Sequence, residues 1–217
     1  MKQVVKVFVA SEKHVPGRVI ESQAGRRLKV GPSPGGWKTL PMARILWHNT
    51  MSVDGFVALP GDEMSWMAPF VGPNETVQKV LPLIGAILMG GRTYRGVLAS
   101  EAARPYGGAI QVPYLVLTRG DPGSAPPGFQ FLNGSMARVA SSARDIAGDR
   151  YVAVLGQQTG RALLEAGELD EILIHLAPVT LGQGVPMFAG GGCRSQLKLR
   201  EVRQSRRVID LWFDVQR

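Results

Sequence analysis

Two short segments combine glycine with residues suited to holding a phosphate. The apolar run AILM leads into Gly90-Gly91-Arg92-Thr93, and VAVL leads into Gly156-Gln157-Gln158-Thr159-Gly160-Arg161. Glycine lets a ligand approach the backbone, and the first turn of a helix offers free N–H groups and a partial positive charge. The planar fork of Arg92 matches phosphate oxygens. Taken alone, each segment is equally typical of a tight strand-to-helix turn, so both are candidate phosphate sites.

Polar residues also follow two other strand-like runs. Thr118 and Arg119 end the run LVL, and Ser52 and Asp54 follow RILWHNTM, with Trp66 a little further on. Open α/β sheets bind ligands beyond the carboxyl ends of their strands, which makes Thr118-Arg119 a candidate ligand contact. Asp54-Gly55 is first of all a turn signal. Its functional interpretation is a mobile loop over a pocket, in which Asp54 hydrogen-bonds a polar heterocycle or a sugar.

The histidines and the cysteine give a weaker signal. His14, His48 and His175 are scattered and Cys193 is alone, so no metal site is expected. His175 sits inside the strand-like run EILIHLAPV, where a structural role is expected, whereas His48 lies beside the proposed mobile loop and its role is open. No base is placed next to Cys193 by the sequence, which disfavours a nucleophile.

The elements that must position these residues alternate along the chain. Short runs rich in Val, Ile and Leu predict strands at ARILWHNT, GAILMGG, PYLVLT, RYVAVLG, DEILIHLAPV and RRVIDLWFDV. Helices are predicted between them over Asn74–Ile84, Thr93–Ala99, Ser135–Ala147 and Thr159–Ala166. Strands separated by helices indicate an α/β fold with a mostly parallel central sheet. The last run alternates apolar and polar residues, which predicts an antiparallel strand at the C-terminal edge.

Composition and charge limit which other classes of protein this chain can belong to. The chain has 217 residues, of which 45% are hydrophobic, and no apolar run is long enough to span a membrane. Its formal charge of +8 is uneven: residues 1–41 hold eight Lys or Arg and two acids, a net of +6, and the remainder holds 17 and 15, a net of +2. We therefore expect residues 1–41 to be a disordered basic extension of a cytoplasmic protein, and we expect nucleic-acid binding to be unlikely.

Together, four segments in this order resemble the dihydrofolate-reductase-like superfamily, in particular its branch related to the C-terminal reductase domain of bacterial riboflavin biosynthesis. The segments are SVDGFVA (52–58), ILMGGRTY (87–94), LVLTR (115–119) and VLGQQTGRALLEAGELDEILIHLAPVTLGQGVPMF (154–188). The resemblance covers residues 43–217 and implies a three-layer α/β/α reductase domain. It also implies a homodimer.

The resemblance further implies that NADPH lies across the carboxyl ends of the sheet. Phosphates would contact Gly90 to Thr93, Thr118-Arg119 would lie near the adenosine 2′-phosphate, and Gly156 to Arg161 would enclose the pyrophosphate and nicotinamide side. Ser52, Asp54 and Trp66 would contact the substrate, with Asp54 as the catalytic candidate. The enzyme would act mainly by positioning, since the hydride chemistry belongs to the cofactor.

Three departures from the family pattern qualify this expectation. Gln157 stands where a second glycine is usual and bears on cofactor affinity. The stretch FVALPGDEMSW is acidic and apolar where the riboflavin enzymes are basic, which disfavours a phosphorylated ribosyl substrate. The zinc-binding deaminase motifs are absent.

The sequence therefore predicts an NADPH-dependent reductase of a small pterin- or pyrimidine-like heterocycle. Two alternatives stay open: a nucleotide-binding homologue without turnover, and a nucleic-acid-associated protein that uses the basic N-terminal arm.

Overall fold

A single large sheet organises the chain in the computed structural model, which describes residues 43–99, 104–120, 123–188, 194–205 and 207–217. The strand order is β5-β4-β3-β6-β1-β7-β10-β9. In chain order these strands are β1 (Ile45–Ser52), β3 (Ile84–Gly90), β4 (Tyr114–Leu117), β5 (Phe129–Leu132), β6 (Tyr151–Leu155), β7 (Glu171–Ala177), β9 (Leu197–Gln204) and β10 (Ile209–Val215). The strands β2 (Phe56–Ala58) and β8 (Val185–Pro186) form a small second sheet.

The six strands from β5 to β7 are mutually parallel, and β10 pairs antiparallel with both β7 and β9. The predicted parallel sheet with an antiparallel C-terminal part is thus confirmed. The outermost strand is β9, which the sequence analysis did not identify, and β10 lies one place inside it.

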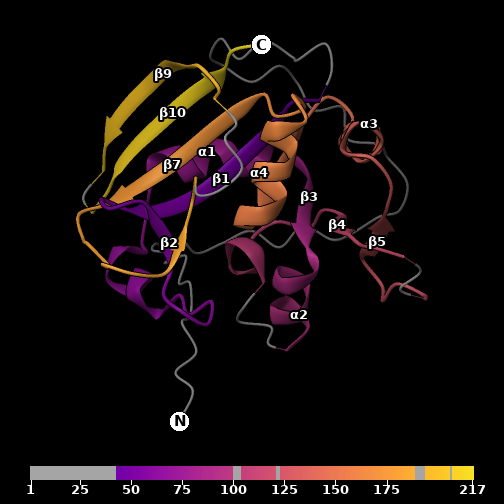
Figure 1. Cartoon of the computed structure of the whole chain (residues 1–217), viewed down its shortest axis with the longest axis horizontal. Coiled ribbons are helices and arrows are strands. Elements are labelled where there is room, and N and C mark those ends of the chain that lie inside the picture. The colour runs from indigo at the N-terminus through magenta and orange to yellow at the C-terminus, as the bar shows by residue number, and fades with distance from the viewer. Residues whose placement is uncertain (1–42, 100–103, 121–122, 189–193, 206) are drawn as a thin grey trace, which may run out of the picture.

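Helices cover both faces of the sheet, because successive side chains of a strand point to opposite sides. Ile45 and Trp47 of β1 belong to a core cluster that is covered by α3 (Met136–Ala147) and α4 (Gln157–Glu165), whereas Leu46 belongs to a second cluster. That second cluster is covered by α1 (Glu75–Val80) and α2 (Gly91–Ala99). Figure 1 shows α4 across the near face of the sheet and α1 behind it. The predicted three-layer α/β/α architecture is therefore confirmed.

Local predictions fail where proline and charge override the simple pattern. The helix predicted over Asn74–Ile84 ends at Val80 and continues as the 3₁₀ turn η2 (Leu81–Leu83), and Ile84 already begins β3. Pro82 has no N–H to continue the α-helical ladder. Two other 3₁₀ turns are η1 (Ser65–Phe70) and η4 (Pro105–Gly108).

Strand β9 was not predicted from the sequence because half of its residues are charged. One of them, Arg200, donates to the fully buried carboxylate of Glu171 at 2.7 Å, and Arg44 also pairs with that carboxylate. The predictions for residues 1–41 and Cys193 lie outside the described residues. No helix in the described part of the chain is both long and apolar enough to cross a membrane.

Candidate active site

A cavity of about 2010 Å³ opens where the parallel strands end. Four neighbouring strands, β4, β3, β6 and β1, contribute residues at or near their carboxyl ends to its wall: Leu117, Gly90, Leu155 and Thr50. Such an edge is where open α/β sheets bind ligands. The volume exceeds the 300–1,000 Å³ that is typical of a pocket for one small molecule, so there is room for a long ligand and a second, smaller one.

The two glycine turns meet on one wall of this cavity. Strands β3 and β6 are neighbours, with Met89 in register with Leu155, so α2 and α4 begin side by side. A Cβ on Gly90 would lie 2.9 Å from Oγ1 of Thr159, and a Cβ on Gly156 would lie 2.9 Å from Oγ1 of Thr93. Gly156 also has a φ of +97°, which side chains disfavour. Each glycine thus makes room for the threonine of the other turn, and this brings two helix N-termini to one place.

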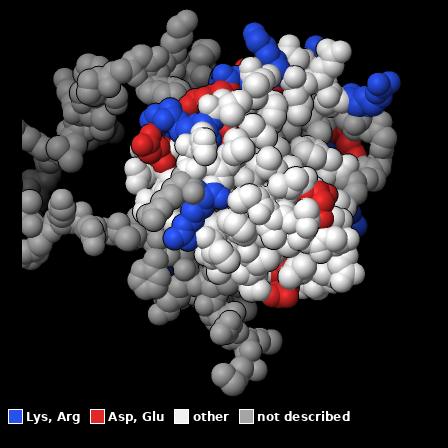
Figure 2. Space-filling view, turned by 90° about the vertical axis from the view of Figure 1, so that its left-hand side faces the viewer, with Lys and Arg blue, Asp and Glu red and all other residues white. Residues whose placement is uncertain are grey.

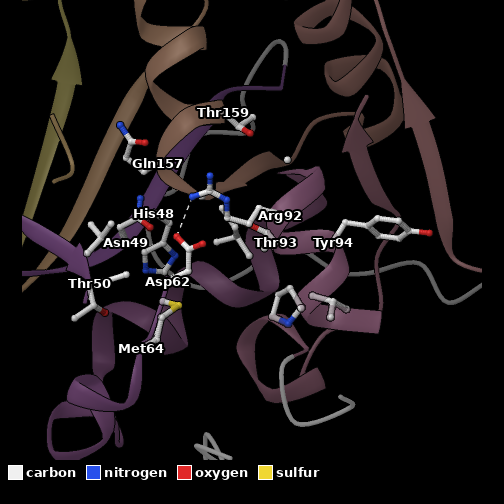
Figure 3. Close-up of a pocket in the computed structure, with 18 of the residues that line it drawn as sticks. His48, Asn49, Thr50, Asp62, Met64, Arg92, Thr93, Tyr94, Gln157 and Thr159 are labelled. Atoms are coloured by element: carbon white, nitrogen blue, oxygen red, sulfur yellow. Dashed lines mark hydrogen bonds and ion pairs between the residues drawn. The ribbon is translucent and has the colours of Figure 1, made fainter. Parts of the chain in front are cut away.

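Positive charge surrounds these helix ends. Arg92, Arg95 and Arg119 all line the cavity. Arg92 donates to the carboxylate of Asp62 at 2.9 Å, and about half of each side chain is exposed. Figure 3 shows this pair near the turns that carry Thr93, Gln157 and Thr159. An exposed ion pair contributes only about 0–1 kcal/mol, so a phosphate can replace Asp62 as the partner of Arg92.

The wall formed by β1 is polar without net charge. His48, Asn49 and Thr50 line it (Figure 3). The Nδ2 atom of Asn49 is buried and has no hydrogen-bond partner among the described residues. A buried donor without a partner costs about 1–3 kcal/mol, and an acceptor on a ligand would remove that cost.

Asp54 holds a loop in place. Its carboxylate accepts hydrogen bonds from Oγ of Ser52 at 2.7 Å, from the backbone N–H of Gly182 at 2.7 Å and from that of Leu181 at 3.0 Å. The Ser52 hydroxyl and these backbone groups lower the pKa of Asp54. Oγ of Ser52 also accepts from the backbone N–H of Phe56 at 2.9 Å. Neither Ser52 nor Asp54 is among the described residues that line the cavity, so their assignment to substrate and catalysis stays a prediction.

The structure brings together ten of the predicted cofactor residues on the cavity wall: Gly90, Gly91, Arg92, Thr93, Thr118, Arg119, Gly156, Gln157, Gln158 and Thr159. Gly160, Arg161 and Trp66 do not line it. Gly160 instead seats α4 on the ring of Trp47, Arg161 pairs with Glu165 at 3.3 Å, and the ring of Trp66 lies 6.3 Å from that of Phe70. Ligand contacts of all these residues remain predictions.

A group that the sequence analysis did not assemble lies at the β1 end of the cavity. Tyr106, His48, His175 and Asp210 form a continuous chain of side-chain hydrogen bonds, and the first three line the cavity. They come from η4, β1, β7 and β10. The two histidines were visible in the sequence, but only the pairing of β1 with β7, and of Asp210 with His175 across β10, places them together.

Three comparisons agree with this architecture. Residues 147–210 match the family model for the RibD C-terminal domain. The uncharacterized protein YwjB of Bacillus subtilis (strain 168) is 21% identical over 172 residues, which are 78% of this chain and 97% of that protein. A putative riboflavin biosynthesis protein from Shewanella sp. PV-4 superposes with a TM-score of 0.68, at 21% identity over 81% of this chain and 100% of that one.

Dihydrofolate reductase from Enterococcus faecalis, solved in complex with NADP(H), has a TM-score of 0.53 to this chain. The identity is 14%, over 79% of this chain and 96% of that one. At such identities the structural likeness shows the fold. The protein therefore has the dihydrofolate-reductase-like fold. Within that fold class, residues 147–210 are similar to the RibD C-terminal domain, in line with the resemblance of the four sequence segments.

Proposed function

We propose that this chain is an NADPH-dependent reductase that transfers a hydride to a small pterin- or pyrimidine-like heterocycle. The observation that carries the proposal is the convergence of two helix N-termini, at Gly91 and Gln157, on one wall of a cavity lined by four arginines. Backbone N–H groups at helix starts bind phosphate oxygens, and two such starts side by side suit a pyrophosphate. The NADP(H) complex of the Enterococcus faecalis enzyme supports the same use of the fold.

The residues on the wall fit a dinucleotide. In this proposal Thr93, Gln158 and Thr159 hold the pyrophosphate, Thr118 and Arg119 the 2′-phosphate, and Asn49 a carbonyl of the nicotinamide or the substrate. When bound, the cofactor supplies the hydride. The chain orients the reacting groups and excludes water at the β1 end of the cavity.

The residues that line the opening of the cavity favour the proposed class of substrate. Asp62 and Glu63 flank the cavity, together with the apolar Met64 and Phe70. Such a rim disfavours a phosphorylated ribosyl group and favours a small uncharged or cationic ring.

The test is a titration of the purified chain with NADPH and NADH, followed by tryptophan fluorescence. Trp47 is buried against α4 and reports on this helix. We expect tight NADPH and weak NADH binding. Arg119→Ala should weaken NADPH binding about tenfold to a hundredfold, because a charge-assisted hydrogen bond contributes about 1.5–3 kcal/mol, and should leave NADH unchanged.

Lys198→Ala is the matched control, since it removes the same charge from an exposed position on β9. Equal affinities for NADPH and NADH, unaltered by Arg119→Ala, would contradict the assignment of the 2′-phosphate site. Bound NADPH without hydride transfer to pterins or pyrimidines would favour the alternative of a binding homologue without turnover. In that case Gln157→Gly tests whether the side chain after Gly156 restricts the cofactor.

We also propose a homodimer formed through the face of β9 and β10 that no helix covers among the described residues. Leu197, Leu199, Val202 and Ile209 are exposed there, on the side of the sheet to which Phe213 also points. Figure 2, which views the molecule from the side where β9 and β10 lie, shows a broad uncharged area with most charged residues toward its margins. The four exposed apolar side chains on these two paired strands form an apolar area that is typical of an interface. A cytoplasmic location remains part of this proposal.

A further inference from the structure

A chain of four side chains leads from the cavity into the core. The hydroxyl of Tyr106 lies 2.8 Å from Nδ1 of His48, Nε2 of His48 lies 2.6 Å from Nε2 of His175, and Nδ1 of His175 lies 2.5 Å from Oδ1 of Asp210. Both histidines are less than a tenth exposed, and Asp210 is 2% exposed. Each link is short enough for direct proton transfer.

Asp210, at the end of this series of hydrogen bonds, fixes the positions of the protons. Asp210 accepts hydrogen bonds from Oγ1 of Thr76 at 2.6 Å and from Nδ2 of Asn74 at 3.0 Å. Burial alone would raise the pKa of Asp210, but the hydrogen bonds from His175, Thr76 and Asn74 lower it. Asp210 is therefore an ionised carboxylate that only accepts, and Nδ1 of His175 must carry a hydrogen.

The remaining links follow from this one. In the neutral state Nε2 of His175 accepts, so Nε2–H of His48 donates to it, and Nδ1 of His48 then accepts from the Tyr106 hydroxyl. All hydrogen bonds point toward Asp210. If the two histidines share one additional proton, the direction reverses: Nε2–H of His175 donates to His48, Nδ1–H of His48 donates to Tyr106, and the Tyr106 hydrogen is free to point into the cavity.

The histidine pair is not built as a metal site. Two imidazole nitrogens that bind one zinc ion each lie about 2.0–2.1 Å from the metal, so nitrogens only 2.6 Å apart leave no room for an ion between them. A shared proton fits that separation.

The backbone at Tyr106 is constrained to keep its hydroxyl in this place. Its φ of 55° and ψ of 26° lie in the left-handed region, which costs a non-glycine residue about 1–3 kcal/mol. The only other non-glycine residue with positive φ in the described part of the chain is Asp62, which also lines the cavity. The Tyr106 ring packs beside His48, with ring centroids 5.5 Å apart. Strained backbone that is retained at a cavity is an independent indication of function.

We propose that Tyr106, His48, His175 and Asp210 form a proton relay, in which Tyr106 is the group that donates a proton to the substrate of the proposed reductase. The inference rests on the proposed function for its substrate, a ring with a C=N bond. As the carbon of that bond receives the hydride, its nitrogen takes the proton of the Tyr106 hydroxyl. The Tyr106 oxygen recovers a proton from Nδ1 of His48, and Nε2 of His48 recovers one from Nε2 of His175.

The step is balanced. One hydride and one proton add across the C=N bond, the cofactor is oxidised by two electrons, and the relay returns to its neutral state with every hydrogen bond pointing toward Asp210. Asp210 keeps its charge throughout and stabilises the additional proton on the histidine pair.

The relay gives reduction a definite pH dependence. Burial, followed by the charge of His175, holds the pKa of His48 well below its ordinary value of 6.5, and Asp210 opposes this. Burial raises the pKa of Tyr106, so its hydroxyl stays protonated. Other charged side chains on the cavity wall are Asp62, Glu63, Arg92, Arg95, Arg104 and Arg119, and α1 adds Glu75, which pairs with Arg203, and Lys79. The fraction of molecules in which the histidine pair holds the additional proton rises as pH falls, so kcat should rise toward acid pH.

The proton positions are tested without any substrate, by NMR of the ¹⁵N-labelled histidine rings. His48→Gln, His175→Gln and His14→Gln assign the three rings. At pH 7 we expect the Nε2–H form of His48 and the Nδ1–H form of His175, and both rings should respond in one joint step when the pair takes up its one additional proton. Two rings in the same neutral form, or two independent protonation steps, would overturn the relay.

The catalytic role is tested by NADPH oxidation with 7,8-dihydrofolate and 7,8-dihydrobiopterin as acceptors. General acids contribute about 10²–10⁴-fold, so Tyr106→Phe should lower kcat about a hundredfold, leave NADPH affinity unchanged and abolish the rise toward acid pH. Tyr114→Phe, which removes a hydroxyl from β4 outside the cavity wall, should leave kcat unchanged. An unchanged kcat and pH profile in Tyr106→Phe would overturn the role of Tyr106 while leaving the reductase in place. Failure to bind NADPH would instead overturn the proposed function, and the NMR titration would then decide on the relay.

Discussion

At the scale of single residues, the carboxylate of Asp54 connects two loops that are far apart in the sequence. It accepts the backbone N–H groups of Leu181 and Gly182 and the hydroxyl of Ser52. We predict that Asp54→Ala removes these acceptors and increases amide hydrogen exchange at Leu181 and Gly182. Asp145→Ala, an exposed change on α3, is the control and should leave both amides unaltered. Unchanged exchange in Asp54→Ala would mean that the loop is held by other contacts.

The same anchor predicts a pH dependence. The pKa of Asp54 is lower in the folded protein than its ordinary value of 3.8, first because of the Ser52 hydroxyl and then because of the two backbone N–H groups. A depressed carboxylate pKa stabilises the fold above the unfolded value and loses that contribution as pH falls through the folded value. Protection factors at Leu181 and Gly182 should therefore be constant at neutral pH and fall only below about pH 3.8.

At the scale of elements, the position of α4 depends on one glycine. A Cβ on Gly160 would lie 2.1 Å from the ring of Trp47, a fully buried side chain of β1. Gly160→Ala should therefore destabilise the fold by about 1–3 kcal/mol through overpacking. By lifting the N-terminus of α4 from the sheet, it should also weaken NADPH binding. Urea unfolding and the fluorescence titration measure these two effects.

Gly96→Ala is the matched control for this change. Gly96 also lies inside a helix, α2, but a Cβ there meets no atom within 4 Å. The substitution should leave stability equal or raise it by about 0.5–1 kcal/mol, because alanine has the higher helix propensity. A similar loss of stability in both variants would contradict the packing explanation.

At the scale of the whole molecule, the homodimer that we propose uses the exposed face of β9 and β10. We predict that light scattering after gel filtration gives twice the chain mass, and that Leu199→Lys gives the mass of a single chain, because a charge would be buried in the interface. Gln130→Lys adds the same charge to an exposed position on β5, at the opposite edge of the sheet, and should leave the dimer intact. A monomeric wild type would contradict the homodimer.

The sequence by itself determined the fold and the side of the cavity that we propose to bind phosphate. Parallel strands and the helices between them follow from local apolar patterns. The segments Gly90 to Thr93 and Gly156 to Thr159 are recognisable from the sequence alone as strand-to-helix turns. Because the carboxyl ends of parallel strands share one edge, placing these turns in one cavity needed no knowledge of side-chain positions. The strands β5 and β9 were not predicted, because the short apolar run of β5 is interrupted by Gln130 and half of the residues of β9 are charged.

Only the tertiary structure decided the opposite end of the cavity. The sequence of the turn, PYGG, does not indicate that the Tyr106 hydroxyl reaches the cavity. The left-handed backbone at Tyr106 depends on the surrounding structure, because such a conformation is unfavourable by itself. His48, His175 and Asp210 are separated by 127 and 35 positions and meet through the order β1-β7-β10, which no local pattern encodes. The substrate contact of Asp54 stays a prediction from its motif, and only the structure showed that its carboxylate also accepts hydrogen bonds from the backbone at 181–182. Short-range periodicity fixes the helices and strands, but long-range packing fixes which polar side chains contact one another.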